Sequence, residues 1–143
     1  MRIGSVIVLL FAFSAGLGLF TFHFARAASY LSDKSEACAN CHVMEEQYGG
    51  WLKGSHRTRA ACNDCHTPHN VVGKYATKAI NGFNHSLAFT TGGYPENIVI
   101  TERNRIITEN TCRSCHAPLF AQTPRKEETA CLQCHAGVGH GRR

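Results

Sequence analysis

The chain has 143 residues and a formal net charge of +5, with eight cysteines and nine histidines. This length allows one domain plus an accessory segment, and the fifteen Lys and Arg residues are dispersed along the whole chain, which excludes a nucleic-acid-binding tract. Large aliphatic residues outside the N-terminus are too few for a protein core alone, so the cysteines and histidines predict a fold organised around a non-peptide group.

The first predicted element is an apolar helix at residues 3–25, which carries no formal charge and contains the run VIVLLFAFSAGLGLFTF. A helix of this length reaches roughly 35 Å, and a bilayer core is about 30 Å thick. We therefore expect a membrane anchor at residues 1–27 and an exported domain at residues 28–143. The alternative is a cleaved signal peptide, because residues 25–27 resemble an A-x-A cleavage site, although signal peptides have shorter apolar regions.

Pairs of small residues lie four positions apart in this helix, Ala12 with Gly16 and Ser14 with Gly18. Such pairs let two membrane helices approach closely. The sequence is therefore compatible with a homo-oligomer. The expected location is the bacterial inner membrane, with the exported domain in the periplasm.

The exported part contains one motif four times, Cys-x-x-Cys-His. The eight cysteines are Cys38, Cys41, Cys62, Cys65, Cys112, Cys115, Cys131 and Cys134, and the histidines that follow each pair are His42, His66, His116 and His135. Two cysteines at this spacing can form thioethers with one haem, and the adjacent histidine reaches the iron. The sequence therefore predicts four covalently bound haem c groups.

Two other interpretations of the cysteines are weaker. A zinc site does not need a histidine after every second cysteine. Disulfides suit an exported chain but give the four histidines no function.

Between the second and third motifs, Asn70 as N-cap and Asn81-Gly82 as a stop predict a short helix over residues 71–81. Lys74, Lys78 and Asn81 would share one face of it. Residues 90–100 are rich in turn residues and then in β-branched residues, so we expect loop and extended chain there.

Thr101 and Thr123, the latter followed by Pro124, are expected to cap short helices that lead into the third and fourth motifs. No stretch predicts a substantial sheet. The expected fold is mainly α with much irregular structure, combining one transmembrane helix with a small tetrahaem domain.

Four irons have eight axial positions, and the remaining exported histidines are His56, His69, His85 and His140. We expect His56 and His140 to be distal ligands of neighbouring haems, whereas His69 follows a proline and is expected to hydrogen-bond locally. At the first motif, Met44 competes with His42 for the iron, and spacing alone does not choose between them.

Several stretches together resemble the NapC/NirT family of membrane-anchored tetrahaem quinol dehydrogenases. They are the anchor, CANCHVM, YGGWLKGSHR, CNDCHTPHNVVGKYATKAINGFNHSLAFTTG, the third motif and CLQCHAGVGHG, which cover nearly the whole chain. The short length is most similar to the small subunits of cytochrome c nitrite reductases.

The resemblance implies a set of iron ligands. Met44, not His42, would bind haem 1 beside the membrane, and His85 matches a family histidine without an assigned iron. Haem 2 would be held by His66 and His140, haem 4 by His135 and His56, and haem 3 by His116 with a second ligand from the partner enzyme.

The resemblance also implies a function. Menaquinol would be oxidised at haem 1, and electrons would pass through haems 2, 4 and 3 to a periplasmic multihaem nitrite reductase that forms ammonia. The family places a lysine and an aspartate near the quinol. Lys74 matches the lysine best and Lys78 second, whereas Asn81 stands where we expect the aspartate and cannot accept a proton. The alternative is a tethered electron carrier that feeds another reductase without its own quinol site.

Overall fold

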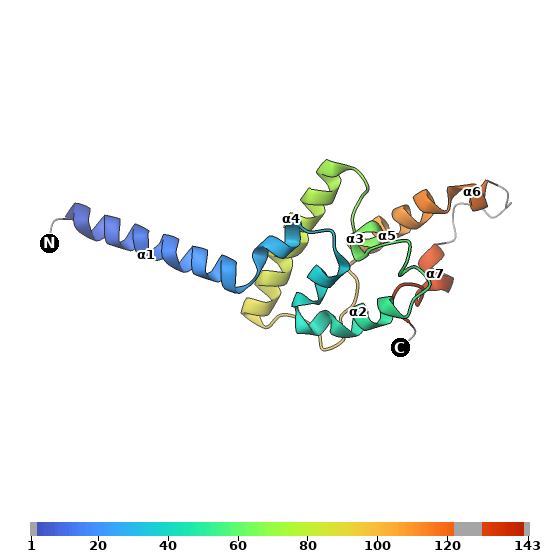
Figure 1. Ribbon diagram of the computed structural model, residues 1–143, viewed down its shortest axis with the longest axis horizontal. Coiled ribbons are helices and arrows are strands. Elements are labelled where there is room, and N and C mark those ends of the chain that lie inside the picture. Colours follow the sequence, from blue (N-terminus) through green and yellow to red (C-terminus); the bar gives the residue numbers. More distant parts are fainter. Residues whose placement is uncertain (1–2, 122–129, 142–143) are drawn as a thin grey trace.

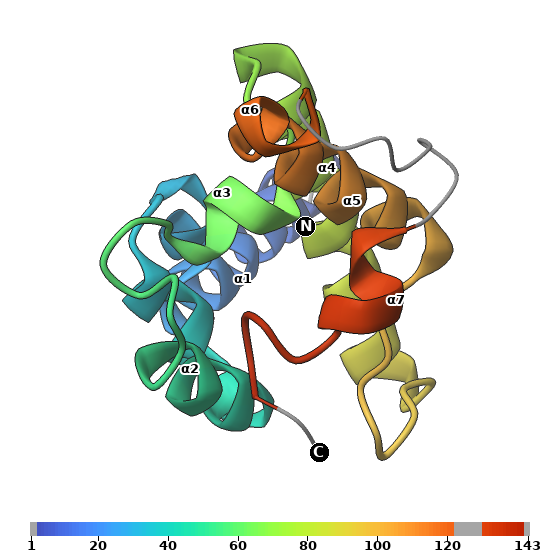
Figure 2. The ribbon, with the colours of Figure 1, turned by 90° about the vertical axis from the view of Figure 1, so that its right-hand side faces the viewer.

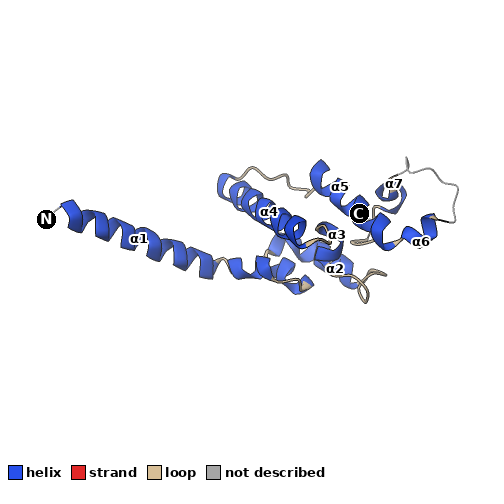
Figure 3. Cartoon of the chain, turned by 90° about the horizontal axis from the view of Figure 1, so that it is seen from above, coloured by secondary structure: helices blue, strands red, loops and turns tan. Residues whose placement is uncertain are grey.

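The structure is a computed structural model that describes residues 3–121 and 130–141. All regular elements among these residues are helices, and none is a strand (Figure 3), which confirms the predicted fold class. The α-helices are α1 Ile3–Phe24, α2 Glu45–Leu52, α3 Cys62–His66, α4 Val71–Thr91, α5 Glu102–Cys115, α6 Ala117–Phe120 and α7 Cys131–His135. Three 3₁₀ helices precede α2: η1 Ala27–Leu31, η2 Ser35–Asn40 and η3 His42–Met44.

Helix α1 projects away from the rest of the molecule as a single straight rod (Figure 1). An 18-residue stretch of it has a mean hydropathy of 2.3, and none of its 22 residues is buried. By length and composition this helix can cross a membrane, as predicted. The remaining helices form the other end of the molecule, where α5 contacts α3 and also α7 (Figure 2).

Helix α4 is longer than predicted. It begins as expected, because the Asn70 side chain accepts a hydrogen bond from the Gly73 N–H at 2.6 Å. The predicted stop at Asn81-Gly82 is wrong, since the helix continues to Gly92, whose φ of 69° ends it in a left-handed conformation. At Gly82 an added Cβ would lie 3.3 Å from the ring of Tyr30, so this glycine permits close packing of η1 on α4.

Two further expectations concern the ends of elements. Thr101 caps α5 as predicted, accepting a hydrogen bond from the Asn104 N–H at 3.4 Å. The loop after α4 is irregular without a strand in the described residues, but Thr90 and Thr91 belong to the helix. The predicted cap at Thr123 lies outside the described residues.

The buried side chains among the described residues are polar. They are Ser35, Thr67, Thr77, Lys78, Thr108 and Thr111, and no described hydrophobic residue is buried. Aliphatic packing therefore does not hold these helices together, in agreement with the composition.

Candidate functional site

The first and second motifs are joined through Ser35, which is 4% exposed. The Cys62 N–H donates a hydrogen bond to the Ser35 hydroxyl at 3.1 Å. The first N–H groups of a helix have no partner within the helix. Ser35, at the start of η2, accepts a hydrogen bond from one of them, that of Cys62 at the start of α3.

The second and third motifs are joined through Thr111, one residue before the third motif and 5% exposed. Its hydroxyl donates to the Cys65 carbonyl oxygen at 2.9 Å. Helix α5 packs directly against α3 in this region. The C-terminal turn of one motif helix is thereby fixed to the N-terminal side of the next motif.

The third and fourth motifs are joined through Glu109 of α5. Its carboxylate accepts hydrogen bonds from the N–H groups of Cys131 at 2.7 Å and Leu132 at 3.3 Å, and it pairs with Arg113 at 3.0 Å. Burial alone would raise the pKa of Glu109, but the N–H groups of Cys131 and Leu132 and the charge of Arg113 hold it below its usual value. A carboxylate is well placed at this end of α7, where the helix dipole is positive.

The four motifs therefore follow one another as a connected row. Each contact joins one motif to the next in chain order, through Ser35, Thr111 and Glu109 in turn. In Figure 1 the first of these elements lies near the end of α1, and α7 lies toward the opposite end of the molecule.

His66 of the second motif faces His140 of the C-terminal segment. Their ring centroids are 5.8 Å apart and their planes differ by 27°. The Nδ1 atom of His140 shares a hydrogen bond with the Gln47 carbonyl oxygen at 3.0 Å, which leaves its Nε2 atom for another partner. Burial, assisted by His140, lowers the pKa of His66 to about 4, so His66 is neutral at pH 7, the form that binds metals.

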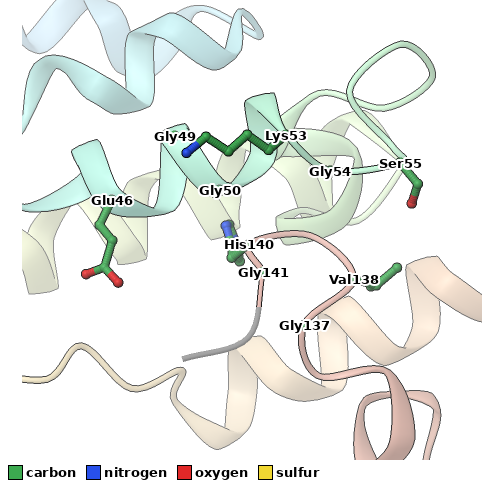
Figure 4. A pocket seen from close by; sticks show the side chains of 10 residues that line it. All are labelled: Glu46, Gly49, Gly50, Lys53, Gly54, Ser55, Gly137, Val138, His140 and Gly141. Carbon is green, nitrogen blue, oxygen red and sulfur yellow. The ribbon is translucent and has the colours of Figure 1, made fainter.

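A cavity of about 650 Å³ lies beside His140, between α2 and the C-terminal segment (Figure 4). Glu46 of α2, Lys53 directly after this helix and Val138 of the C-terminal segment line it. At Gly50 an added Cβ would lie 2.1 Å from the His140 carbonyl oxygen. The close approach that brings His140 to this place therefore requires a glycine at position 50.

His56 faces His116 of the third motif. Their ring centroids are 6.1 Å apart, with planes at 79°. The resemblance instead assigned His56 to the fourth motif, with His135. The pairing seen in the structure differs from that expectation because the loop from Gly54 to Ala61 brings His56 against the end of α5, which chain spacing does not reveal.

The two candidates at the first motif lie together in η3. His42 begins this turn and is exposed, whereas Met44 ends it and is half-buried. The structure thus brings both side chains to the same short element.

Lys74 and Lys78 of α4 both reach Asp33, in the link between η1 and η2. Lys78 donates at 2.8 Å to one carboxylate oxygen and Lys74 donates to the other. The hydrogen bonds from Lys74 and then Lys78 lower the pKa of Asp33 to about 2. Asn81 makes no described hydrogen bond to Asp33. Its side-chain amide instead forms hydrogen bonds of 3.2 and 3.4 Å with that of Asn104 on α5.

The two other histidines have local partners. His85 shares a hydrogen bond with the Tyr30 hydroxyl at 3.2 Å, and burial lowers its pKa. His69 shares one with the Asp64 carbonyl oxygen at 3.0 Å, which is the local role predicted for it.

The facing histidine pairs fit an iron between each pair. An imidazole nitrogen binds a metal at about 2 Å and lies about 1 Å from its ring centre, so two rings on one ion have centroids roughly 6 Å apart. Both observed separations, 5.8 and 6.1 Å, match this value. Exposed apolar side chains such as Ile80, Phe83 and Ile106 suit contact with a large apolar ring.

The zinc and disulfide interpretations find no support in this geometry. In the described part of the chain no three His, Cys, Asp or Glu side chains come together as a metal cluster. All eight cysteines lie in that part, and none is paired with another.

Sequence reasoning missed Asp33, Ser35 and Glu109. Asp33 is one of two acidic residues between the anchor and the first motif, the other being Glu36, and the sequence does not distinguish them. Glu109 stands three residues before the third motif, yet its partners belong to the fourth.

Comparison with known proteins agrees with these features. A family model described as the NapC/NirT cytochrome c family, N-terminal region, matches residues 1–143. The cytochrome c-type protein NrfH of Wolinella succinogenes is 39% identical over 94% of this chain and 84% of its own length. The cytochrome c nitrite reductase subunit NrfH of Nitratidesulfovibrio vulgaris is 32% identical over 78% of this chain and 70% of its own length.

Among solved structures, a chain of the crystal structure of a cytochrome c nitrite reductase NrfHA complex bound to the inhibitor HQNO has a TM-score of 0.71. It is 27% identical and the match covers 93% of this chain and 91% of that chain. The whole-length family match, the cysteine motifs and the facing histidines lead to one conclusion: the chain belongs to the NapC/NirT cytochrome c family, whose members carry covalently bound haem c.

Proposed function

We propose that this chain is a membrane-bound quinol dehydrogenase that oxidises menaquinol and delivers the electrons to a periplasmic cytochrome c nitrite reductase, which reduces nitrite to ammonia. Two relatives carry the name NrfH, and one of them is named as a subunit of cytochrome c nitrite reductase. The similar solved chain comes from a complex with that enzyme. Residues 1–27 would anchor the protein in the inner membrane, and residues 28–143 would lie in the periplasm.

The observation that carries this proposal is the order of the elements. The membrane helix ends at Phe24, and the lysine cluster at Asp33 follows within ten residues. Of the four motifs the first lies nearest to α1, and α3, α7 and the end of α5, which carry the other three, lie farther away (Figure 1). Of the four motifs, the first would be the nearest to a quinol dissolved in the bilayer. Electrons would leave from the side of the domain away from α1, near α7.

Four c-type haems, one on each cysteine motif, would supply the one-electron redox centres of this row. The contacts through Ser35, Thr111 and Glu109 favour the motif order one, two, three, four. We propose this order in place of the route through haems 2, 4 and 3 that the resemblance implied.

The chain's own residues would hold the irons as follows. Met44 is proposed at the first motif, His66 with His140 at the second, and His56 with His116 at the third, where the two rings face each other. The ligand from the partner enzyme then belongs opposite His135 of the fourth motif. We assign no iron to His85, which is hydrogen-bonded to Tyr30.

Lys74 and Lys78 are the proposed quinol-site residues. A quinol gives up two electrons and two protons, so its site needs hydrogen-bond donors for its oxygens and a path for protons to water. Lys74, with 24% of its side chain exposed, can donate to a quinol oxygen while it keeps its bond to Asp33. Asn81 is not placed to take the role of the expected aspartate, since its amide is bound to Asn104.

The test is reduction of the purified protein by a menaquinol analogue in detergent, followed by haem absorbance. We expect reduction, and we expect Lys74→Ala to slow it, with dithionite as the control that reduces every haem. A protein that dithionite reduces but quinol does not would instead be a tethered electron carrier. Purification from membranes should recover a multihaem nitrite reductase with this chain, and another reductase would refute the proposed partner.

A further inference from the structure

Asp33 is the meeting point of three elements of the domain. It lies in the link at residues 32–34, between η1 and η2, directly after the membrane-proximal turn. Lys74 and Lys78 reach it from α4, and the Asn63 side chain reaches it from α3 at 3.3 Å. The neighbouring Ser32 carbonyl oxygen accepts from Lys78 at 2.8 Å and from Asn63 at 3.2 Å.

The two lysines use different oxygens of the one carboxylate. Lys78 takes Oδ1 and Lys74 takes Oδ2, so the carboxylate separates two ammonium groups that would otherwise repel each other. Each ammonium has three donors. Lys78 has two of them engaged, with Asp33 and Ser32, whereas the described contacts of Lys74 engage one.

The cluster has a closed side and an open side. Lys78 is 8% exposed, while 24% of the Lys74 side chain and 55% of the Asp33 side chain are exposed. A ligand can therefore approach Lys74 and Asp33 but not Lys78. The bonds to Asp33 also raise the pKa of Lys74, so its ammonium stays charged at neutral pH.

We propose that Asp33 is a positioning residue of the quinol site, whose carboxylate fixes the ammonium groups of Lys74 and Lys78 so that the exposed one faces a quinol oxygen. This inference rests on the proposed quinol oxidation. It places the carboxylate of the site on the link after the membrane helix and not on α4, where the sequence has Asn81. Asp33 acts through the lysines, and the two protons of the quinol leave to water.

The test compares Asp33→Asn and Asp33→Glu with the wild-type protein, each carrying its haems. The asparagine variant keeps the shape and removes the charge, so we expect the KM for a menaquinol analogue to rise about tenfold while kcat stays within about twofold. Asp33→Glu restores the charge and should recover most of the loss. Glu102→Gln is the matched control, because it removes an exposed carboxylate paired with Arg105 at 2.7 Å, far along the chain from the cluster.

A second measurement does not depend on turnover. An amine-reactive reagent should label Lys78 slowly in the wild-type protein and several-fold faster in Asp33→Asn, with the exposed Lys53 as internal reference. The quinol analogue should protect Lys74 from labelling in the wild-type protein and protect it less in Asp33→Asn.

The outcomes separate the two proposals. Wild-type protein that quinol fails to reduce would refute the proposed function and this inference with it. Wild-type protein that quinol reduces, together with an unchanged KM in Asp33→Asn, would refute the role of Asp33 alone. A lower kcat at unchanged KM with an altered haem spectrum would show a purely structural residue, and would also overturn the inference.

Discussion

Gly50 of α2 lies so close to His140 that a Cβ at position 50 would be 2.1 Å from the His140 carbonyl oxygen. The pairing of His140 with His66 therefore depends on the absence of a side chain at position 50, which lies outside all four motifs. We predict that Gly50→Ala displaces the C-terminal segment and separates the two rings. One haem should change from low spin to high spin, as measured by absorbance and electron paramagnetic resonance.

Gly49→Ala is the matched control for this change, because nothing lies within 4 Å of a Cβ at position 49. Both substitutions have the same effect on helix propensity, so only contact with His140 distinguishes them. A low-spin spectrum in Gly50→Ala would contradict the assignment of His140 as a ligand.

The hydrogen bonds that Glu109 accepts from α7 are expected to stabilise the fold measurably. Its carboxylate receives two N–H groups at the start of α7, and hydrogen bonds to a charged group stabilise more than neutral ones. We expect Glu109→Gln to lower the free energy of unfolding by about 1 kcal/mol, measured by urea denaturation followed by helical ellipticity. Glu102→Gln removes a surface ion pair and should change it by less than about 0.5 kcal/mol. Equal effects of the two would show that the cap on α7 is unimportant.

The lowered pKa of Asp33 predicts a dependence of stability on pH. The pKa of Asp33 is about 2 in the folded protein and 3.8 ordinarily. Its contribution to the free energy of unfolding is therefore fully present above pH 3.8 and is lost as the pH falls through about 2. The difference in melting temperature between the wild-type protein and Asp33→Asn should be constant at neutral pH and vanish near pH 2. A difference that persists in acid would mean that the carboxylate charge is not what stabilises the link.

The haem assignment predicts a count. Cys131→Ser combined with Cys134→Ser should leave a protein with three covalent haems instead of four, as measured by intact mass. The same pair of substitutions at the second motif should also remove one haem. A wild-type mass without four added haems would contradict the attachment at each motif.

The sequence predicted the local features of the fold well. The apolar N-terminal helix and the caps at Asn70 and Thr101 are as expected, because each depends on neighbouring residues in the chain. The predicted end of α4 at residue 81 was wrong, and the reason lies outside residues 71–81. Gly82 reads as a stop, but the ring of Tyr30 packs on it, and this contact offsets the roughly 1 kcal/mol that a glycine costs inside a helix.

The sequence predicted which residue types form the candidate site better than it predicted which histidines face each other. The four motifs could be found from spacing, and the position of His140 opposite His66 agrees with the pairing that the resemblance implied. The neighbour of His56 could not, because its approach to His116 is set by how α5 packs on α3, across 60 positions of chain. Asp33 was missed for the same reason, since its two lysine partners lie 41 and 45 residues away.

The polar interior has a consequence for how this protein tolerates change. In most small domains, evolution conserves aliphatic positions and lets hydroxyl-bearing residues drift. Here the hydroxyls of Ser35 and Thr111 join successive motifs, whereas large apolar residues such as Val72 and Phe83 are 81% and 68% exposed in the polypeptide. A saturation mutagenesis map should therefore show its deepest intolerance at small polar residues next to the cysteines.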